Sequence, residues 1–254
     1  AVLASGSNGN AVLCRTESAT ILIDAGISLR ELTRRMHALS RDPQTIDAVL
    51  VTHEHGDHVR GLRPLARRFG VPVYCSQGTA DVLRNHGRYG VAPQQIHAFD
   101  SGEEFSLDGL SVETFSLHHD GTDPSGFVLS GGGLRCGICT DTGLCCDRIR
   151  TVFSTLDACV LESNYDPQML RESSRPWVLK RRIGGERGHL SNDEAAGLYF
   201  DHAADRLRLL FLAHRSAECN TIELMERTFG ERNGEKVEKI GTRVVSTSRE
   251  RSTG

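Results

Sequence analysis

The chain has 254 residues, enough for one large α/β domain, and its 25% charged and 38% hydrophobic residues are ordinary for a globular protein. No apolar run approaches the roughly 18 residues that span a membrane, and the first residues lack the basic and apolar regions of a signal peptide. We therefore expect a cytoplasmic protein with no membrane partner. The formal net charge of −3 gives no overall preference for nucleic acid, and the oligomeric state is left open.

The first part of the chain alternates apolar runs with helical patterns. Strands are predicted at Thr20–Asp24, Ala48–Thr52 and Val71–Tyr74, and helices at about 28–39, 61–69 and 79–85. A polar, glycine-containing turn, Ser5–Asn10, precedes them. Ser28 and Glu31 have the spacing of a capping box at the start of the first helix.

The second part is richer in strands. From Ile96 to Ser130 the pattern is β-rich, with a hairpin turn at Asp108-Gly109. Strands follow at 134–140, 158–162, 207–212 and 242–246, and helices at 191–204 and 217–229. Ser191 and Glu194 have the spacing of a second capping box. This order is compatible with two mixed sheets flanked by helices, which is an α/β class.

No internal repeat or linker divides the chain. We therefore predict a single domain over 1–247 and a disordered polar tail over 248–254. Eight cysteines occur, and the CxxC spacing of Cys136 and Cys139 is compatible with a separate zinc site. Both lie in a β-like run that would project them to opposite faces, so we interpret most cysteines as small buried side chains in a reducing cytosol.

Ligand-type side chains are concentrated at His53, His55, Asp57 and His58, directly after the apolar run 48–51. A strand delivers the first two to one side because its side chains alternate faces. The chain then turns and presents the other two from the loop or from the first turn of the next helix. This density of imidazoles and carboxylate indicates two divalent metals a few ångströms apart.

Three later segments add ligand-type side chains after apolar strands. They are His118-His119, Asp141 and His214. Side chains at the ends of strands lie on a rigid sheet edge, where binding sites are common. Asp141 is suited to bridging two cations. Zinc suits the imidazoles and manganese also suits the carboxylates, so the metal is left open.

The motif H-x-H-x-D-H at 53–58, together with these strand ends, resembles the metallo-β-lactamase fold superfamily. The resemblance implies a four-layer αβ/βα sandwich and two divalent metal ions, Zn or Mn. It assigns one metal to His53, His55 and His119 and the other to Asp57, His58 and His214, with Asp141 bridging. His119 is preferred to His118 because residues 119–127 are similar to a subfamily segment, H-D-x-x-D-P-x-G-[YF]. A contribution from His118 is left open.

Longer stretches are similar to the WalJ/YycJ family within that superfamily. They are residues 2–10, 21–26, 161–166, 188–192 and 212–214. This resemblance implies a metal-dependent hydrolase, specifically a 5′→3′ exonuclease acting on double-stranded DNA. Tyr165 departs from the family pattern, which has His at that position of an E-S-N-H-D segment.

The resemblance also implies catalytic roles. Two metals sharing Asp141 would hold a bridging hydroxide as the nucleophile, and Asp57 would accept a hydrogen bond from it. His189 lies in a Gly-His motif that nuclease relatives use, so it would bind a phosphate or protonate the leaving O3′. A surface histidine at the start of a helix is the other interpretation of His189.

Basic residues gather beside the metal motifs. Segment 171–187 carries Arg171, Arg175, Lys180, Arg181, Arg182 and Arg187 against Glu172 and Glu186, and Arg60, Arg63, Arg67 and Arg68 follow the first motif. They are either solvated surface or phosphate contacts. The candidate substrate-binding residues are Ser7, Asn8, Asn164, Lys180, Arg182 and Ser191.

Other functions of this fold are left open. The short spacing from Asp141 to His214 has no room for the large inserted domain of RNase J-like nucleases. The alternatives are a small-molecule or cyclic-nucleotide phosphodiesterase and a glyoxalase II-like thioesterase. A non-catalytic regulator is disfavoured because every ligand position is filled.

Overall fold

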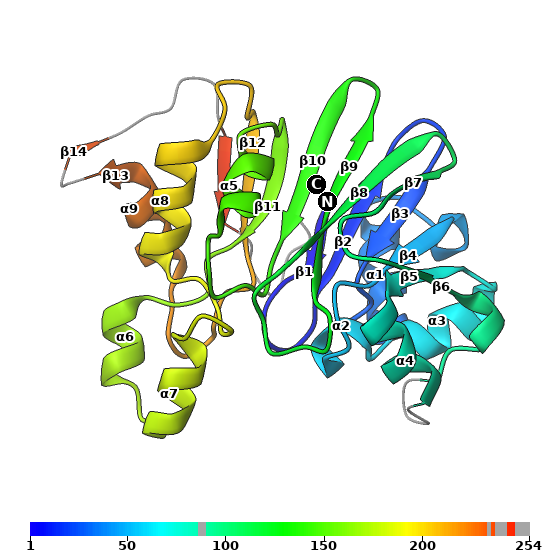
Figure 1. Ribbon diagram of the computed structural model, residues 1–254, viewed down its shortest axis with the longest axis horizontal. Coiled ribbons are helices and arrows are strands. Elements are labelled where there is room, and N and C mark those ends of the chain that lie inside the picture. Colours follow the sequence, from blue (N-terminus) through cyan, green and yellow to red (C-terminus); the bar gives the residue numbers. More distant parts are fainter. Residues whose placement is uncertain (86–89, 233–234, 237–242, 247–254) are drawn as a thin grey trace. The chain divides into compact units, whose positions relative to one another are not determined.

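The computed structural model describes residues 1–85, 90–232, 235–236 and 243–246. The chain divides into two compact units (Figure 1): unit 1 comprises Ala1–Ser116 and Gly121–Phe127, and unit 2 comprises Leu117–Asp120 and Val128–Thr247. The single domain predicted over 1–247 stays a prediction, and the predicted tail at 248–254 lies outside the described residues. Among the described helices, none has the length and apolar character of a membrane span.

Unit 1 contains a mixed sheet of six strands in the order β1-β2-β3-β4-β5-β6. Its strands are β1 (Val2–Ala4), β2 (Ala11–Arg15), β3 (Thr20–Ile23), β4 (Ala48–Leu50), β5 (Val73–Ser76) and β6 (Ile96–Phe99), and the hairpin β7 (Glu104–Leu107) and β8 (Leu110–Ser116) follows. Its helices are α1 (Leu29–Ala38), α2 (Gly56–Val59), α3 (Leu62–Phe69) and α4 (Gln77–Asn85), with 3₁₀ turns η1 (Pro43–Thr45) and η2 (Pro93–Gln95). Pairing is antiparallel from β1 to β3 and parallel from β3 to β6.

The parallel strands of unit 1 are buried, which explains their apolar runs. All residues of β3 and β4 are buried, as expected for strands covered on both faces. Helix α1 turns Leu32 and Met36, four positions apart, into the core. The capping box predicted at its start is half formed: Ser28 accepts a hydrogen bond from the Glu31 amide, but the Glu31 carboxylate pairs with two arginines of the helix instead.

Unit 2 is built on parallel strands with helices beside them. Its strands are β10 (Leu134–Cys139), β11 (Ala158–Glu162), β12 (Leu209–Ala213) and β15 (Arg243–Ser246), with the short pair β13 (Glu231–Arg232) and β14 (Glu235–Lys236). Its helices are α5 (Asp147–Phe153), α6 (Pro167–Glu172), α7 (Trp177–Ile183), α8 (Asn192–His202) and α9 (Ile222–Gly230). Strand β9 (Ser125–Gly131) begins in unit 1 and continues into unit 2. The seven-stranded sheet has the order β15-β12-β11-β10-β9-β8-β7.

The parallel strands of unit 2 end side by side. Cys139 at the end of β10 pairs with Leu161 of β11, and Glu162 at the end of β11 pairs with Ala213 of β12. Parallel strands end at the same edge of a sheet, so the residues after β10, β11 and β12 share one edge. This edge is where the ligand-type residues of unit 2 lie.

The predicted elements agree with the structure except at short helices, one helix start and the pair β13 and β14, which was not predicted; residue 242 of the strand predicted at 242–246 lies outside the described residues. The helix predicted over 217–229 begins only at Ile222, because the Ser216 hydroxyl accepts a hydrogen bond from the Cys219 amide in a preceding turn. Helices α5, α6 and α7 were not predicted, since six or seven residues show little periodicity. The second capping box, Ser191 with Glu194, is confirmed.

Candidate metal centre

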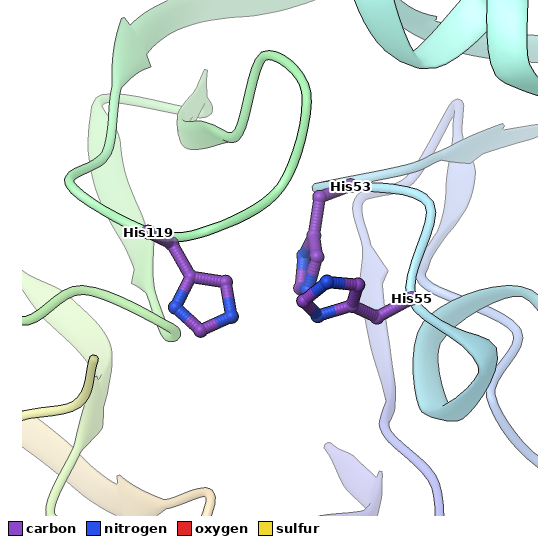
Figure 2. A group of neighbouring side chains, drawn as sticks. All are labelled: His53, His55 and His119. Carbon is purple, nitrogen blue, oxygen red and sulfur yellow. The ribbon is translucent and has the colours of Figure 1, made fainter. Parts of the chain in front are cut away.

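Unit 1 contributes four ligand-type side chains from one loop and its following helical turn. His53 and His58 are fully buried, and their ring centroids lie 4.1 Å apart. The ring centroids of His53 and His55 lie 4.5 Å apart in an edge-to-face arrangement, and Figure 2 shows the two side chains close together. Asp57 and His58 lie on the single turn of α2, as predicted for the segment after the turn. The loop therefore gathers three imidazoles and a carboxylate inside unit 1.

A second layer of hydrogen bonds orients two of these imidazoles. His58 Nδ1 lies 2.7 Å from Oδ2 of buried Asp24, a carboxylate that accepts the Nδ1 proton. Thr52 donates its hydroxyl to the same carboxylate at 3.0 Å and accepts from His53 Nδ1 at 3.0 Å. Both rings thus have Nδ1 engaged, so Nε2 is the ring atom that each would offer to a metal.

Asn10 and Gly26 hold the turn that carries Asp57. The Asn10 amide nitrogen lies 3.0 Å from His58 Nε2 and 3.4 Å from Asp57 Oδ2. A Cβ on Gly26 would come within 1.6 Å of the Asp57 carbonyl oxygen, so no larger residue fits there. The Ser5–Asn10 turn and the 21–26 stretch therefore both support the ligand loop.

Unit 2 gathers four ligand-type side chains at the carboxyl edge of its parallel strands. One ligand atom each from Asp141, Glu162, His189 and His214 lies within 4.8 Å of the others. Asp141 follows β10, Glu162 ends β11, His214 follows β12 and His189 precedes α8. Three of these residues were predicted as site residues, and Glu162 was not. Its signal in the sequence, an acidic residue that ends an apolar strand, is the same as that of Asp141.

Glu162 is the central support of the unit 2 cluster. Its side chain is fully buried, and its Oε1 accepts from Nδ1 of His189 and of His214, each at 2.8 Å. Its Oε2 accepts from the backbone amides of Thr142 at 3.0 Å and Leu190 at 3.2 Å. Burial alone would raise the pKa of Glu162, but the charges and hydrogen bonds of His189 and His214 hold that pKa well below its usual range.

His119 shows the same pattern of Nδ1 hydrogen bonding as the other predicted ligand histidines. Its Nδ1 donates to the carbonyl oxygen of Gly188 at 2.9 Å, and its Nε2 lies 3.7 Å from Asp141 Oδ1. Its place on the loop after β8 can be followed in Figure 2. His118, its neighbour, is half-buried, and its backbone amide and carbonyl bond to Thr142 and Gly143. The choice of His119 over His118 stays a prediction.

In each unit, residues with a positive φ occur beside or among the ligand-type side chains. Five non-glycine residues in the described part of the chain have a positive φ, and three of them are Asp24 (59°), Asp141 (64°) and His214 (54°). Each follows a parallel strand and turns its side chain at the strand end. The left-handed region costs free energy for residues with a Cβ. This strained backbone conformation occurs at Asp24, which supports His58, and at the predicted ligands Asp141 and His214. Such strain is typical of functional sites.

The predicted substrate-binding residues fall into two groups. Ser7 and Asn8 are exposed in the first turn, and Lys180 and Arg182 lie on α7. Asn164 and Ser191 are buried and bonded within the chain: Asn164 donates to the His214 carbonyl at 2.7 Å, and Ser191 caps α8. These two side chains support the His214 loop and the α8 start, and a role in substrate binding stays a prediction for all six.

The donor sets fit divalent metals. In four of the predicted ligand histidines, His53, His58, His119 and His214, a hydroxyl, carboxylate or carbonyl oxygen contacts Nδ1, so that Nε2 is the ring atom each would offer to a cation. The carboxylates of Asp57 and Asp141 complete a nitrogen and oxygen set that suits Zn²⁺ or Mn²⁺. The metal-type groups found among the described residues contain no cysteine. Cys139 and Cys159 are buried strand residues instead.

Comparisons with known proteins agree with these features. Residues 19–211 match the sequence profile of the Beta-lactamase superfamily domain. The chain is 34% identical over 228 residues to Exodeoxyribonuclease WalJ of Streptococcus pneumoniae, which covers 89% of this chain and 85% of the relative. It is also 34% identical over 223 residues to Exodeoxyribonuclease YycJ of Bacillus anthracis, which covers 88% of this chain and 84% of that relative.

A solved structure extends the comparison to the fold. The metallo-β-lactamase fold protein YhfI of Bacillus subtilis superposes with a TM-score of 0.71 over 98% of this chain and 95% of its own, at 14% identity. This likeness confirms the predicted α/β class with two mixed sheets flanked by helices. On the profile match and the two relatives, the chain belongs to the metallo-β-lactamase superfamily and, within it, to the WalJ/YycJ family.

Proposed function

We propose that this protein is a metal-dependent exonuclease that degrades double-stranded DNA from the 5′ end. The proposal is supported by its similarity to two proteins named exodeoxyribonucleases and by the histidine and aspartate clusters of both units. Its substrate is a nucleic acid. The proposal adds that this nucleic acid is duplex DNA and that digestion proceeds from the 5′ end. We also propose a cytoplasmic location, which cell fractionation tests.

We further propose two divalent metal ions. One would be held by His53, His55 and His119 and the other by Asp57, His58 and His214, and Asp141 would be shared by both. The Nδ1 hydrogen bonds inside each unit support this assignment, because they preset Nε2 of the histidines as the ligand atom. When bound, two such ions supply Lewis-acid stabilisation of a phosphodiester and a water that ionises near neutral pH.

Two residues of the chain would act on the reacting groups directly: Asp57 would orient the attacking water, and His189 would donate a proton. Asp57 is partly exposed, with 22% of its side chain accessible, and can accept a hydrogen bond from the attacking water. His189 has 20% of its side chain accessible and donates Nδ1–H to Glu162, so its Nε2 is available for a second proton. An ionised Glu162 stabilises the imidazolium that results. His189 is therefore suited to protonate the leaving O3′ as the P–O bond breaks.

The carboxylate of Glu162, shared by His189 and His214, supports the nuclease proposal beyond what the metal motif supports. A histidine that is only partly buried shares its supporting carboxylate, Glu162, with the ligand His214. This arrangement couples a proton donor to the metal cluster through a single buried group. A purely metal-binding module has no need of a second, accessible histidine on that carboxylate.

The test is digestion of end-labelled duplex DNA with Mn²⁺ or Zn²⁺. Wild type should remove nucleotides stepwise from the 5′ end, and Asp57→Asn should lower the rate about 10²- to 10³-fold, the effect of removing one contact to the transition state. Asp81→Asn is the matched control, because this carboxylate is 71% accessible and pairs with Arg84 on the surface of α4. Metal content of all three proteins is measured by mass spectrometry.

Different outcomes separate the alternatives. No duplex digestion by metal-loaded wild type, with hydrolysis of bis-p-nitrophenyl phosphate or a cyclic nucleotide, would replace the exonuclease by a small-molecule phosphodiesterase. Digestion by Asp57→Asn at the wild-type rate would remove Asp57 from the site. Stepwise loss from the 3′ end would overturn the polarity alone.

A further inference from the structure

The segment between β11 and α8 presents a large aromatic side chain to solvent. Trp177, the first residue of α7, has 71% of its surface exposed, and Val178 beside it has 78%. No residue of α7 is buried. In Figure 1 α6 and α7 form a pair of short helices that projects from the rest of unit 2. An aromatic ring gains little by facing water, so such exposure indicates a binding surface.

The same segment is strongly basic. α7 carries Lys180, Arg181 and Arg182 and no acidic residue. Lys180 Nζ donates to a backbone carbonyl at 2.6 Å, and Arg181 is exposed. Positive charge next to an exposed aromatic ring complements a strand of nucleic acid, whose phosphates carry the negative charge and whose bases offer flat faces for stacking. We call residues 167–187 the basic arm.

The basic arm is attached directly to the His119 loop. Arg182 Nε donates to Asp120 Oδ2 at 2.5 Å, and Arg187 Nε donates to the His119 carbonyl at 3.2 Å. The carbonyl of Gly188 accepts the Nδ1 proton of His119 at 2.9 Å. The C-terminal end of α7 is therefore next to a predicted metal ligand. Trp177 lies five residues earlier, about 8 Å along the helix axis or about two base steps of B-form DNA.

We infer that Trp177 stacks on an unpaired base of the DNA substrate while Lys180 and Arg181 bind the phosphates of the same strand. This inference rests on the proposed function and adds to it a preference for substrates with an unpaired end. A blunt duplex offers Trp177 no free base face until its end frays. Stacking and phosphate contacts would then guide the strand toward the ligand cluster.

The chain offers a direct probe, because Trp177 is its only tryptophan. The metal-loaded protein is titrated with phosphorothioate oligonucleotides, which resist hydrolysis, and the tryptophan fluorescence is recorded. We expect saturable quenching that is stronger for a duplex with a single-stranded overhang than for a blunt duplex. In parallel, the anisotropy of a labelled oligonucleotide measures affinity independently of Trp177.

Variants separate stacking from charge. Trp177→Ala should weaken binding of the overhang substrate about 5- to 100-fold, the usual effect of losing one stacked base, whereas Trp177→Phe should retain most of the affinity. Arg181→Ala should lower the slope of log affinity against log salt by about 0.7, the value for one phosphate contact on a single strand. Leu134→Ala is the control, because Leu134 is equally apolar and 63% exposed but lies at the start of β10.

Each outcome decides between the two proposals. Duplex digestion without quenching, and with Trp177→Ala binding like wild type, would overturn the role of Trp177 and leave the exonuclease standing. Quenching without digestion of an ordinary phosphodiester duplex would support the role of Trp177 and overturn the exonuclease. A blue shift on anionic phospholipid vesicles, with no response to oligonucleotides, would assign the basic arm to a membrane surface and overturn the inference.

Discussion

The two units assemble their ligand-type side chains in different ways. In unit 1 they come from one stretch, His53 to His58, in which a strand end and a single helical turn are enough. In unit 2 they come from separate places, after β10, after β12 and before α8. The first set is brought together by the local chain, and residues distant in the sequence, such as Asp24, only orient its rings. The second set exists only because parallel strands end at one edge of a sheet.

The supports of the two sets differ as well. In unit 1 Asp24 forms a direct hydrogen bond with the ring of His58. Its contact with His53 is indirect and runs through the Thr52 hydroxyl. In unit 2 a single carboxylate, Glu162, bonds to both His189 and His214. A change at the support of unit 1 should therefore alter metal binding only. A change at the support of unit 2 should alter metal binding and proton transfer together.

The variant with the largest expected effect, His189→Ala, tests whether His189 is a proton donor or a further metal ligand. His189→Ala should lower kcat about 10²- to 10⁴-fold, the usual contribution of a general acid. Metal content should remain that of wild type, because the proposed ligands are intact. His97→Ala, at an exposed histidine of β6, serves as the matched control. Loss of metal from His189→Ala would instead make it a ligand.

The next prediction compares the two supports directly. Glu162→Gln and Asp24→Asn should each weaken metal affinity about 10- to 100-fold, the scale of losing a partner behind a ligand histidine. Excess metal should restore kcat in Asp24→Asn but leave a deficit in Glu162→Gln, since His189 has then lost its charged partner. Metal titration with activity as the readout distinguishes the two curves. Equal recovery of both variants would contradict the division of roles.

The smallest expected effect comes from Glu31, a carboxylate that is only partly exposed. Its hydrogen bond to Arg34, together with the Arg35 contact, lowers the pKa of Glu31 to about 2. A carboxyl whose pKa is lowered on folding stabilises the protein above its unfolded pKa, near 4.5 here, and loses that contribution as the pH falls toward 2.

Glu31→Gln should therefore lower the free energy of unfolding by less than about 1 kcal/mol at pH 7, because the cluster is partly exposed to solvent. The difference from wild type should shrink between pH 4.5 and pH 2 in urea unfolding experiments. A difference that grows on acidification would contradict the sign of this contribution.

Much of the fold was predictable because burial leaves a pattern in the sequence. The apolar runs of β3, β4 and β11 gave their positions, and the strand predicted at 158–162 has the observed bounds. Short helices left too few periods to be detected, although Asp166 before Pro167 is a capping signal for α6. The capping box at Ser28 is only half formed because two nearby arginines compete for the Glu31 carboxylate.

The sequence by itself determined the chemistry of the site. The histidines and aspartates that follow apolar strands provide the nitrogen and oxygen atoms that could bind metals, and the family resemblance assigns these residues to two metal ions. The tertiary structure decided which of their neighbours act. Asp24 and Glu162 are polar residues at the ends of strands, like many surface residues, until folding buries them against the rings of His58, His189 and His214. A buried carboxylate must be paired to remain charged, and only the folded chain shows its partners.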